Sequence, residues 1–229
     1  LCESGFSMGA LGFEDEKYAI TRIGYFLQND EMTKGNLNYN HDVNYKGLFY
    51  LDEALKSGKP VGLRHTFSKT EETIYPILTK LPKKAKDSWF GFDHFYSDAA
   101  FKSLVDIMSK RGIKTLLDVG GNTGKWSIAL TNASPETTVT ILDHKAQIDA
   151  AFVNAEEAGV KERVKGYPLD LLDHSKAFPD NVDGVWMSQF LDCFPPSDIV
   201  NLLKRARTAL NSNGKVYIVE PFWDRQSHE

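Results

Sequence analysis

The stretch LLDVGGNTGKWSIAL, residues 116–130, decides the fold that the sequence predicts. An apolar run leads into a turn with three glycines and then into residues typical of a helix, which indicates a buried strand followed directly by a helix. Gly120, Gly121 and Gly124 have no Cβ atom, so a ligand could contact the backbone N–H groups at the start of that helix. A tight turn that holds nothing explains the same glycines as well.

The alternation of strand and helix continues to the end of the chain. We expect strands over residues 114–120, 138–143, 163–170, 182–189 and 215–221, with helices over residues 124–133, 144–159 and 198–214. Strands separated by helices pair in parallel through right-handed crossovers. The predicted fold is therefore a doubly wound, Rossmann-like α/β sheet, in which ligands bind beyond the carboxyl ends of the strands.

The first part of the chain follows another pattern. The charged turn from Glu14 to Lys17 separates two β-like segments, and Thr21 is suited to cap the next helix. A helix with such a hairpin is the shape of a winged helix. We expect a polar junction at residues 81–89 and a boundary between two domains, residues 1–85 and 86–229. Further helices are expected over residues 42–58, 70–82 and 97–112.

Composition excludes several classes of protein. The net charge of −4 lacks the basic excess typical of nucleic-acid binders. Cys2 and Cys193 do not have the spacing of a disulfide framework or a zinc site, which favours a reducing compartment, the cytoplasm, and no metal. No apolar run is long enough to span a membrane, and no basic and apolar leader opens the chain.

Three acids at predicted strand ends indicate the ligand. Asp118 would repel a pyrophosphate, which disfavours a nicotinamide dinucleotide, but it can accept hydrogen bonds from an ammonium group. Asp143 lies at the distance from the glycines expected of an acid that binds ribose hydroxyls, although it could also cap the next helix. Asp170, beside Leu171 and Leu172, could accept a hydrogen bond from an adenine amino group, or it could be a solvated turn residue. Together the acids describe a site for S-adenosylmethionine.

Five stretches resemble successive motifs of the class I S-adenosylmethionine-dependent O-methyltransferases, in the branch of the plant caffeate-type and animal hydroxyindole enzymes with bacterial relatives. They are residues 116–130, 138–144, 166–172, 182–210 and 213–221. The resemblance implies a small-molecule acceptor, S-adenosylhomocysteine as product, and an N-terminal winged-helix domain that forms a homodimer. Since such enzymes continue past the fifth strand, we expect this chain to be a fragment, with a partial dimerisation domain and an incomplete C-terminus.

The resemblance also implies roles for Gly120 and Gly121 at the methionine end of the cofactor, for Asp143 at the ribose, and for Asp170 with Leu171 at the adenine. We expect Asp118 and Gln189 to bind the cofactor as well. Residues 88–98 are similar to the family's helix that closes over cofactor and acceptor, with Phe92, His94, Phe95 and Tyr96 as pocket candidates. The alternative is that these aromatic side chains belong to a core between the domains.

The catalytic position departs from the family. Where the plant-type enzymes carry a histidine general base, this chain has Asp192. A carboxyl pKa of about 3.9 suits a phenol of pKa about 10 less well than an imidazole of about 6.5. Glu220 corresponds to an acid that flanks the family histidine, and His94 is another candidate base.

The expected function is transfer of a methyl group to an oxygen of a small aromatic acceptor. One alternative is a protein of the same fold that binds the cofactor but has lost or altered the transfer. A winged-helix regulator is the other.

Overall fold

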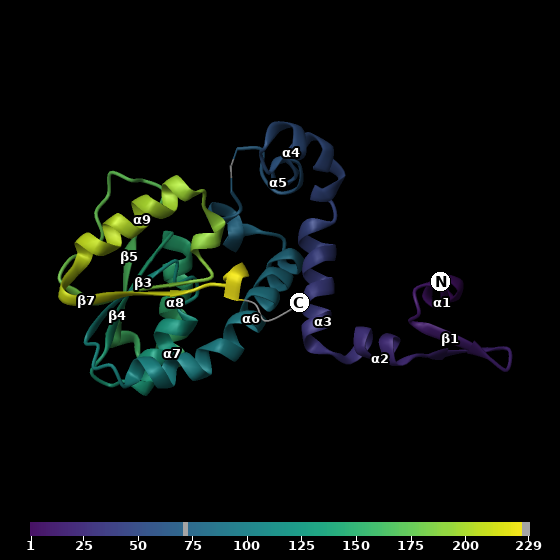
Figure 1. The fold of residues 1–229 in the computed structure, drawn as a ribbon, viewed down its shortest axis with the longest axis horizontal. Helices are drawn as coiled ribbons and strands as arrows, with labels where there is room; N and C mark the ends of the chain where they lie inside the picture. The colour runs from purple at the N-terminus through teal and green to yellow at the C-terminus, as the bar shows by residue number, and fades with distance from the viewer. Residues whose placement is uncertain (71–72, 226–229) are drawn as a thin grey trace. The chain divides into compact units, whose positions relative to one another are not determined.

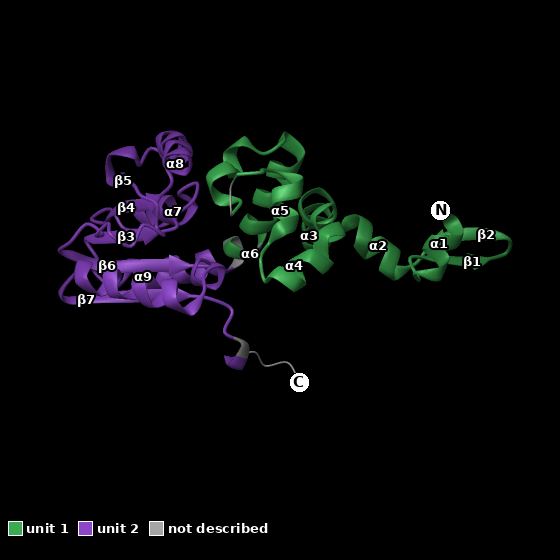
Figure 2. Cartoon of the chain, turned by 90° about the horizontal axis from the view of Figure 1, so that it is seen from above, with its two compact units in different colours: residues 1–98 green, residues 99–229 purple. Residues whose placement is uncertain are grey.

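Figure 1 shows a computed structural model of the chain, which describes residues 1–70 and 73–225. The chain divides into two compact units, Leu1–Asp98 and Ala99–Glu229 (Figure 2). The division falls inside the long helix α6 (Lys83–Ser109). The polar stretch at residues 81–89, which we expected to separate two helices, is therefore mostly helical itself. Since α6 belongs partly to each unit, the predicted domain boundary at residue 85 stays a prediction.

The second unit is built on a parallel sheet, as the sequence predicts. Within the described residues its strand order is β5-β4-β3-β6-β7, and every neighbouring pair is parallel. The strands are β3 (Thr115–Val119), β4 (Thr138–Asp143), β5 (Val164–Pro168), β6 (Val182–Ser188) and β7 (Leu210–Val219). The chain runs outward from β3 to β5 and then returns to the other side of β3 for β6. The carboxyl ends of β3 and β6 thus form the switch point at which such sheets bind ligands.

Helices cover both faces of this sheet (Figure 1). Leu117 and Val119 of β3 pack in one cluster with α9 (Pro196–Ala209). On the opposite face Leu116 packs with α6 and with α7 (Lys125–Ala133). Helix α8 (Lys145–Glu157) packs against β4 and β5 on that second face. Because successive strand side chains alternate, Asp118 projects toward the face covered by α7.

The predicted helix over residues 198–214 is too long. It ends at Ala209, and β7 begins at Leu210, so that Gly214 lies within a strand. The register shifts between Val182 and Gly184, where residues 211–214 take up extra length opposite β6. The Asn and Gly residues that suggested a helix end instead mark this irregularity in the strand pairing.

The first unit contains the predicted hairpin. Strands β1 (Leu11–Glu14) and β2 (Lys17–Ile20) pair antiparallel between α1 (Cys2–Ser7) and α2 (Arg22–Asn29). Thr21 caps α2 as expected, because its hydroxyl oxygen accepts a hydrogen bond from the backbone N–H of Gly24 at 3.1 Å. The assignment of this unit as a winged helix stays a prediction.

The remaining helices of the first unit are shorter than the sequence suggests. After α3 (Glu31–Tyr39), the segment expected as one helix consists of a π-helical turn, a 3-10 turn and α4 (Leu51–Ser57). Helix α5 (Val61–Thr66) follows, and only Tyr75–Lys80 form a 3-10 helix within the predicted helix 70–82. Residues 71 and 72 of that prediction lie outside the described residues. Within the described parts of the chain, no helix combines the length and the apolarity that crossing a membrane requires.

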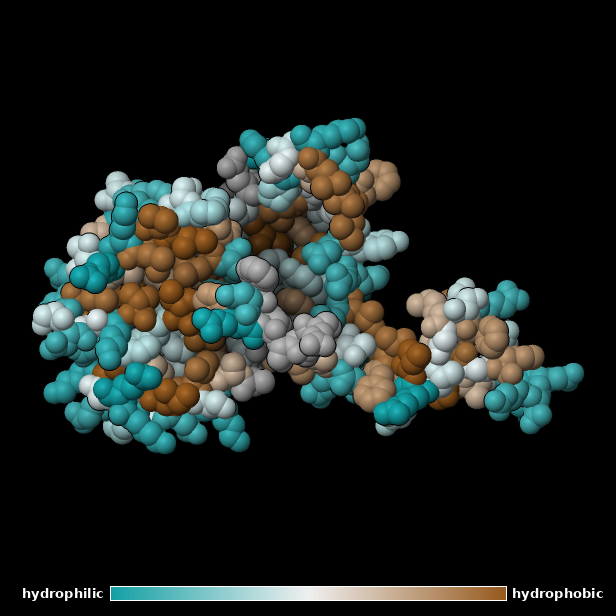
Figure 3. All heavy atoms as spheres, viewed as in Figure 1, coloured by the Kyte–Doolittle hydropathy of each residue, from teal (hydrophilic) through white to brown (hydrophobic). Residues whose placement is uncertain are grey.

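Many apolar side chains of the first unit are exposed (Figure 3). Phe49 is 86% exposed and Leu55 is 75% exposed. A small core nonetheless forms around Val43, Leu78 and Leu81. The unit therefore has a core of its own together with apolar surface that another surface could cover.

We predict opposite effects for two glycine-to-alanine substitutions in neighbouring helices. A Cβ atom on Gly24 would lie 2.1 Å from the carbonyl oxygen of Ala10, so Gly24→Ala should force α2 away from the hairpin and destabilise it by about 1–3 kcal/mol. A Cβ atom on Gly35 would meet nothing within 4 Å, so Gly35→Ala should stabilise α3 by up to about 1 kcal/mol. Thermal unfolding and limited proteolysis of the hairpin measure both effects, and equal effects would contradict the packing described.

Candidate functional site

The residues selected from the sequence gather at the carboxyl edge of the parallel sheet. The glycine turn follows β3, Asp143 ends β4, Asp170 follows β5, and Gln189 follows β6. Each lies at or just beyond the end of a strand in the second unit. The fold thus brings together, at the switch point, groups that are up to 71 positions apart in the sequence, from Asp118 to Gln189.

The glycine turn is packed tightly on two sides. Gly120 has a φ of +73°, and a Cβ atom there would lie 2.4 Å from the ring of Phe190. A Cβ atom on Gly121 would lie 2.7 Å from a carboxyl oxygen of Asp118. Both positions thus require glycine for packing, and Gly120 also requires it for its backbone conformation.

Asp118 lies beneath this turn. It is 3% exposed, and its Oδ2 accepts a hydrogen bond from the Ser127 hydroxyl at 2.6 Å. Burial raises the pKa of Asp118 to about 7, and the negative charge of Asp143 adds to the rise, while the hydrogen bond from Ser127 opposes it. Asp118 therefore supports the turn from the α7 side. Its predicted contact with a cofactor ammonium group stays a prediction.

Asp143 joins the end of β4 to the glycine turn. Its Oδ2 accepts a hydrogen bond from the backbone N–H of Asn122 at 2.9 Å, and its Oδ1 accepts one from the N–H of His144 at 2.7 Å. Burial raises the pKa of Asp143, and these two hydrogen bonds oppose the rise. His144, rather than Asp143, is the N-cap residue of α8. The capping role that the sequence left open for Asp143 is thus wrong.

The loop after β5 begins beside Asp143. The backbone N–H of Leu169 donates to the carbonyl oxygen of Asp143 at 3.0 Å. Asp170 is exposed and accepts a hydrogen bond from the N–H of Leu172 at 3.0 Å, whereas Leu171 is buried. An exposed carboxylate, an apolar side chain and the acid of β4 therefore lie along one edge.

The segment after β6 is held by Glu220, which follows β7. Oε1 of Glu220 accepts hydrogen bonds from the backbone N–H groups of Phe190 and Leu191, each at 2.8 Å. Gln189 is exposed with a φ of +49°, and its N–H donates to Val219 at 2.9 Å. Glu220 therefore fixes the main chain of this segment.

Asp192 is the exposed acid of the same segment. It lies in the single 3-10 turn Leu191–Cys193. Burial is the main cause that raises the pKa of Glu220, and the charge of Asp192 contributes to the rise, whereas the two N–H donors lower it. The structure thus brings two predicted catalytic acids together, one committed to the backbone and one open to solvent.

The third predicted catalytic residue, His94, belongs to the first unit. It lies in α6, where its ring centroid is 5.7 Å from that of Phe90. Phe92 stacks on Tyr39 with ring centroids 4.3 Å apart, so it contributes to packing within that unit. The side chain of Tyr96 lies outside the described residues. The catalytic role of His94 stays a prediction.

Two residues of the site were missed from the sequence. Ser127 is a fully buried polar residue of α7, and its position on the apolar face of that helix was an available signal. Phe190 gave no signal, because its contact with Gly120 depends on how the segments after β3 and β6 approach each other.

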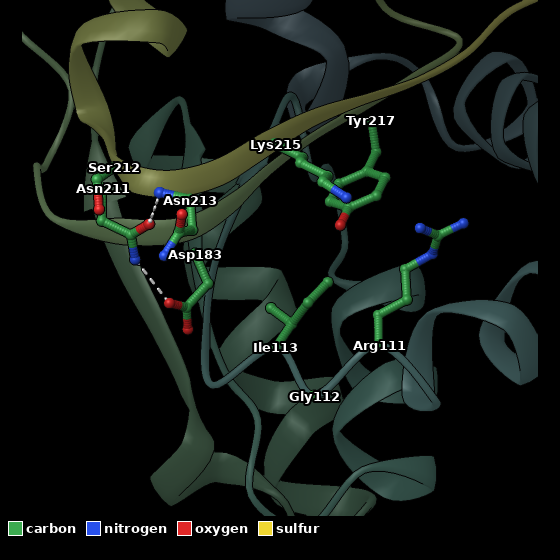
Figure 4. A pocket seen from close by; sticks show the side chains of 9 residues that line it. All are labelled: Arg111, Gly112, Ile113, Asp183, Asn211, Ser212, Asn213, Lys215 and Tyr217. Carbon is green, nitrogen blue, oxygen red and sulfur yellow. Dashed lines mark hydrogen bonds between the residues drawn. The ribbon is translucent and has the colours of Figure 1, made fainter.

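A separate hollow of about 490 Å³ lies at the opposite edge of the sheet (Figure 4). Arg111, Lys215 and Tyr217 line it, together with Asp183 at the start of β6, which accepts a hydrogen bond from Asn211 at 2.7 Å. This hollow is distinct from the candidate site because it adjoins the amino ends of β3 and β6. Among the described residues, no cluster of three or more His, Cys, Asp or Glu side chains could hold a metal ion.

Comparison with known proteins identifies similar chains. The sequence model of the O-methyltransferase domain matches residues 92–229. L-tyrosine C(3)-methyltransferase of Streptomyces lavendulae is 29% identical over 92% of this chain and 57% of its own length. Bacteriochlorophyllide d C-20 methyltransferase of Chlorobaculum tepidum is 25% identical over 96% of this chain and 63% of its own length. The chain thus spans 57% and 63% of the length of these two curated relatives.

Solved structures share the fold. PigF with SAH superposes with a TM-score of 0.71 at 17% identity, over 94% of this chain and 64% of that chain. The mitomycin 7-O-methyltransferase MmcR superposes with a TM-score of 0.70 at 17% identity, over 95% of this chain and 63% of that chain. Both similarities extend over nearly all of this chain.

The buried carboxyl group of Asp118 predicts a dependence of stability on pH. Its folded pKa, near 7, lies above its ordinary value of 3.8, so the native state holds an extra proton between these values. Its contribution to stability is present in full below pH 3.8 and is lost as the pH rises toward 7, with a slope of at most about 1.4 kcal/mol per pH unit. Asp118→Asn should therefore gain stability relative to the wild type as the pH rises from about 5 to 8.

Urea denaturation at several pH values measures this difference. Ser127→Ala removes a hydrogen bond that lowers the pKa of Asp118, so the loss of stability should extend to higher pH in that variant. A constant difference between Asp118→Asn and the wild type across the range would contradict the buried position of the carboxyl group.

Proposed function

The chain belongs to the O-methyltransferase domain family, and from that premise we propose that its protein is an S-adenosylmethionine-dependent methyltransferase acting on a small aromatic acceptor. The main support for this function is the arrangement of residues at the carboxyl edge of the sheet. A glycine turn, an acid at the end of β4, and an exposed acid beside a buried leucine after β5 lie together at the switch point. Bound S-adenosylmethionine would supply a methyl group activated on a sulfonium.

The residues at this edge fit that cofactor. Gly120 and Gly121 follow β3 at the carboxyl edge, so their backbone would border the methionine end of the cofactor. Each carboxyl oxygen of Asp143 accepts one hydrogen bond from the backbone and can still accept another, from a ribose hydroxyl. Asp170 would accept a hydrogen bond from the adenine amino group, with Leu171 beside the ring. Gln189 would border the cofactor from the end of β6.

We propose that Asp192 acts as the base and Glu220 supports it. Asp192 is exposed at the carboxyl edge, so it can reach an acceptor, and it would take the hydroxyl proton on a carboxylate oxygen. Glu220 holds the main chain of Phe190 and Leu191, directly before Asp192. Glu220 would therefore fix the position of the Asp192 backbone.

A second candidate is transfer to carbon or nitrogen. The two relatives described above are named for transfer to C(3) of tyrosine and to C-20 of bacteriochlorophyllide d. Phenazine-1-carboxylate N-methyltransferase of Pseudomonas aeruginosa, 27% identical over 73% of this chain, is named for transfer to nitrogen. Asp192 in place of a histidine favours this candidate, because a carboxylate is a weak base for a phenol.

We also propose a homodimer in the cytoplasm. The exposed apolar side chains of the first unit, among them Phe49 and Leu55, would be covered by a second copy of the chain. Cys2 and Cys193 are both exposed and neither forms a disulfide in the part of the chain that the structure describes, which suits a reducing compartment. Sedimentation equilibrium tests the dimer.

Removing the charge of Asp143 should weaken cofactor binding. Asp143→Asn keeps an oxygen for the Asn122 N–H but loses a charge-assisted hydrogen bond worth about 1.5–3 kcal/mol, so S-adenosylhomocysteine should bind about 10–100 times more weakly. Asp149→Asn, on the exposed side of α8, is the matched control and should bind as the wild type does. Calorimetry measures all three affinities. A wild type that does not bind, or two variants that behave alike, would contradict the proposed site.

Removing the charge of Asp192 should slow transfer without weakening binding. A positioned general base contributes about 10²–10⁴ to a rate, so Asp192→Asn should lower kcat by about that factor for a hydroxyl acceptor. Its affinity for S-adenosylhomocysteine should stay that of the wild type, and Asp180→Asn, an exposed acid in the loop after β5, is the control. Radioactive methyl transfer to phenols, anilines and thiols measures the effect. An unchanged kcat on phenols would rule out Asp192 as their base.

A further inference from the structure

The loop between β5 and β6 carries the residues proposed to bind adenine. Its first residue, Leu169, is tied to the end of β4 through the carbonyl oxygen of Asp143. Beyond Leu171 the loop turns back on itself, since the N–H of Asp173 donates to the carbonyl oxygen of Asp170 at 3.0 Å and that of Lys176 donates to Asp173 at 3.1 Å. These turns are short and local, and Leu171 and Phe178 pack in the core, so a polar contact from outside the loop would further fix the orientation of its backbone.

Arg205 of α9 supplies that contact. Nη2 donates to the carbonyl oxygen of Leu171, and Nη1 donates to the carbonyl oxygens of Asp173 at 3.3 Å and Lys176 at 3.2 Å. The guanidinium group also lies over the ring of Phe178, 4.7 Å from its centroid. A single side chain thus holds three carbonyl groups of the loop and stacks on a fourth residue.

The three hydrogen bonds to the loop depend on the shape of the arginine head group. A planar fork with several N–H donors can reach three carbonyl oxygens at once, whereas a lysine ammonium is a single point of charge. Phe178 packs in the same apolar cluster as Leu202 and Ala206, so the stacked guanidinium is backed by the core of the unit. The loop is therefore fixed to α9, an element that is itself rigidly packed on the sheet.

We propose that Arg205 is a positioning residue for the adenine half of the cofactor site. By holding Leu171, Asp173 and Lys176 through their carbonyl groups, it sets the direction of the backbone at Asp170 and Leu171. Asp170 then presents its carboxylate to the amino group of the base, and the cofactor site becomes selective for adenine over a purine that lacks this amino group. This inference rests on the proposed function.

The test compares two ligands and three variants of the chain. The ligands are S-adenosylhomocysteine and S-inosylhomocysteine, which has a carbonyl group in place of the adenine amino group. Arg205→Lys keeps the charge but loses the fork, and Arg205→Met keeps the apolar stem over Phe178. Arg207→Met is the matched control, because Arg207 is exposed on the same helix and Arg205 is not. Calorimetry, at a temperature where circular dichroism shows each variant folded, gives the affinities.

We expect both Arg205 variants to bind S-adenosylhomocysteine about tenfold more weakly, the size of one lost hydrogen bond to a charged group. The affinity for S-inosylhomocysteine should fall much less in these two variants, so their preference for the adenine ligand should decrease. Arg207→Met should keep the wild-type preference. An equal loss of affinity for both ligands, or no loss of affinity, would overturn the inference. Binding of S-adenosylhomocysteine by the wild type would still support the proposed function in that case. No binding by the wild type would overturn both.

Hydrogen exchange without ligand gives a second readout. In Arg205→Lys, the amides of residues 171–178 should exchange faster than in the wild type and in Arg207→Met, because their loop has lost its support. Unchanged exchange in this segment would overturn the inference whatever the binding results. Because this test uses Arg205→Lys, it can be carried out even if Arg205→Met does not fold.

Discussion

The hydrogen bond between Asp143 and the backbone of Asn122 is the contact on which the carboxyl edge depends. It joins the end of β4 to the glycine turn after β3. The position of this turn determines which side chains can pack against it. Asp118 fills the space below Gly121, and Phe190 fills the space beside Gly120. Two carboxyl groups are buried here; burial raises the pKa of both, and the charge of Asp143 adds to the rise for Asp118. The edge is built from groups whose burial costs stability, which is common where a fold forms a binding site.

Side chains from neighbouring elements hold each segment of this edge. Asp143 holds the turn after β3, Glu220 holds the segment after β6, and Arg205 holds the loop after β5. In each case a carboxyl or guanidinium group binds backbone groups of another segment, and a charged side chain makes stronger hydrogen bonds than a neutral one. Loops that would otherwise sample many conformations are thereby fixed relative to the rigid sheet. Side chains that a ligand could meet, such as those of Asp170 and Asp192, then stand on supported backbone.

The sequence predicts the sheet and the place of the site because both follow from local patterns. Apolar strands alternate with helices, and acids at strand ends must share one edge in a parallel sheet, so the positions of Asp143 and Asp170 could be inferred. The end of α9 could not, because the extra length of residues 211–214 is accommodated only through pairing with β6. The hydrogen bonds that an acidic side chain makes could not be inferred from the sequence either. The sequence predicts Glu220 as a catalytic residue, whereas its two hydrogen bonds to backbone N–H groups depend on a segment 29 and 30 positions away.

With Asp192 as the proposed base, the identity of the acceptor atom becomes a question of base strength. Removing a proton from a phenol before or during methyl transfer calls for a base whose pKa approaches that of the phenol, and a carboxylate is far from it. When an aromatic carbon takes the methyl group, the proton leaves afterwards from a ring carbon that has become strongly acidic, and a weak base is enough. Burial and the charge of Asp192 raise the pKa of Glu220, but Glu220 is already bound to two backbone N–H groups. With Asp192 as base and Glu220 as its support, as proposed, the site suits transfer to carbon, or to a hydroxyl group that is already acidic, better than transfer to an ordinary phenol.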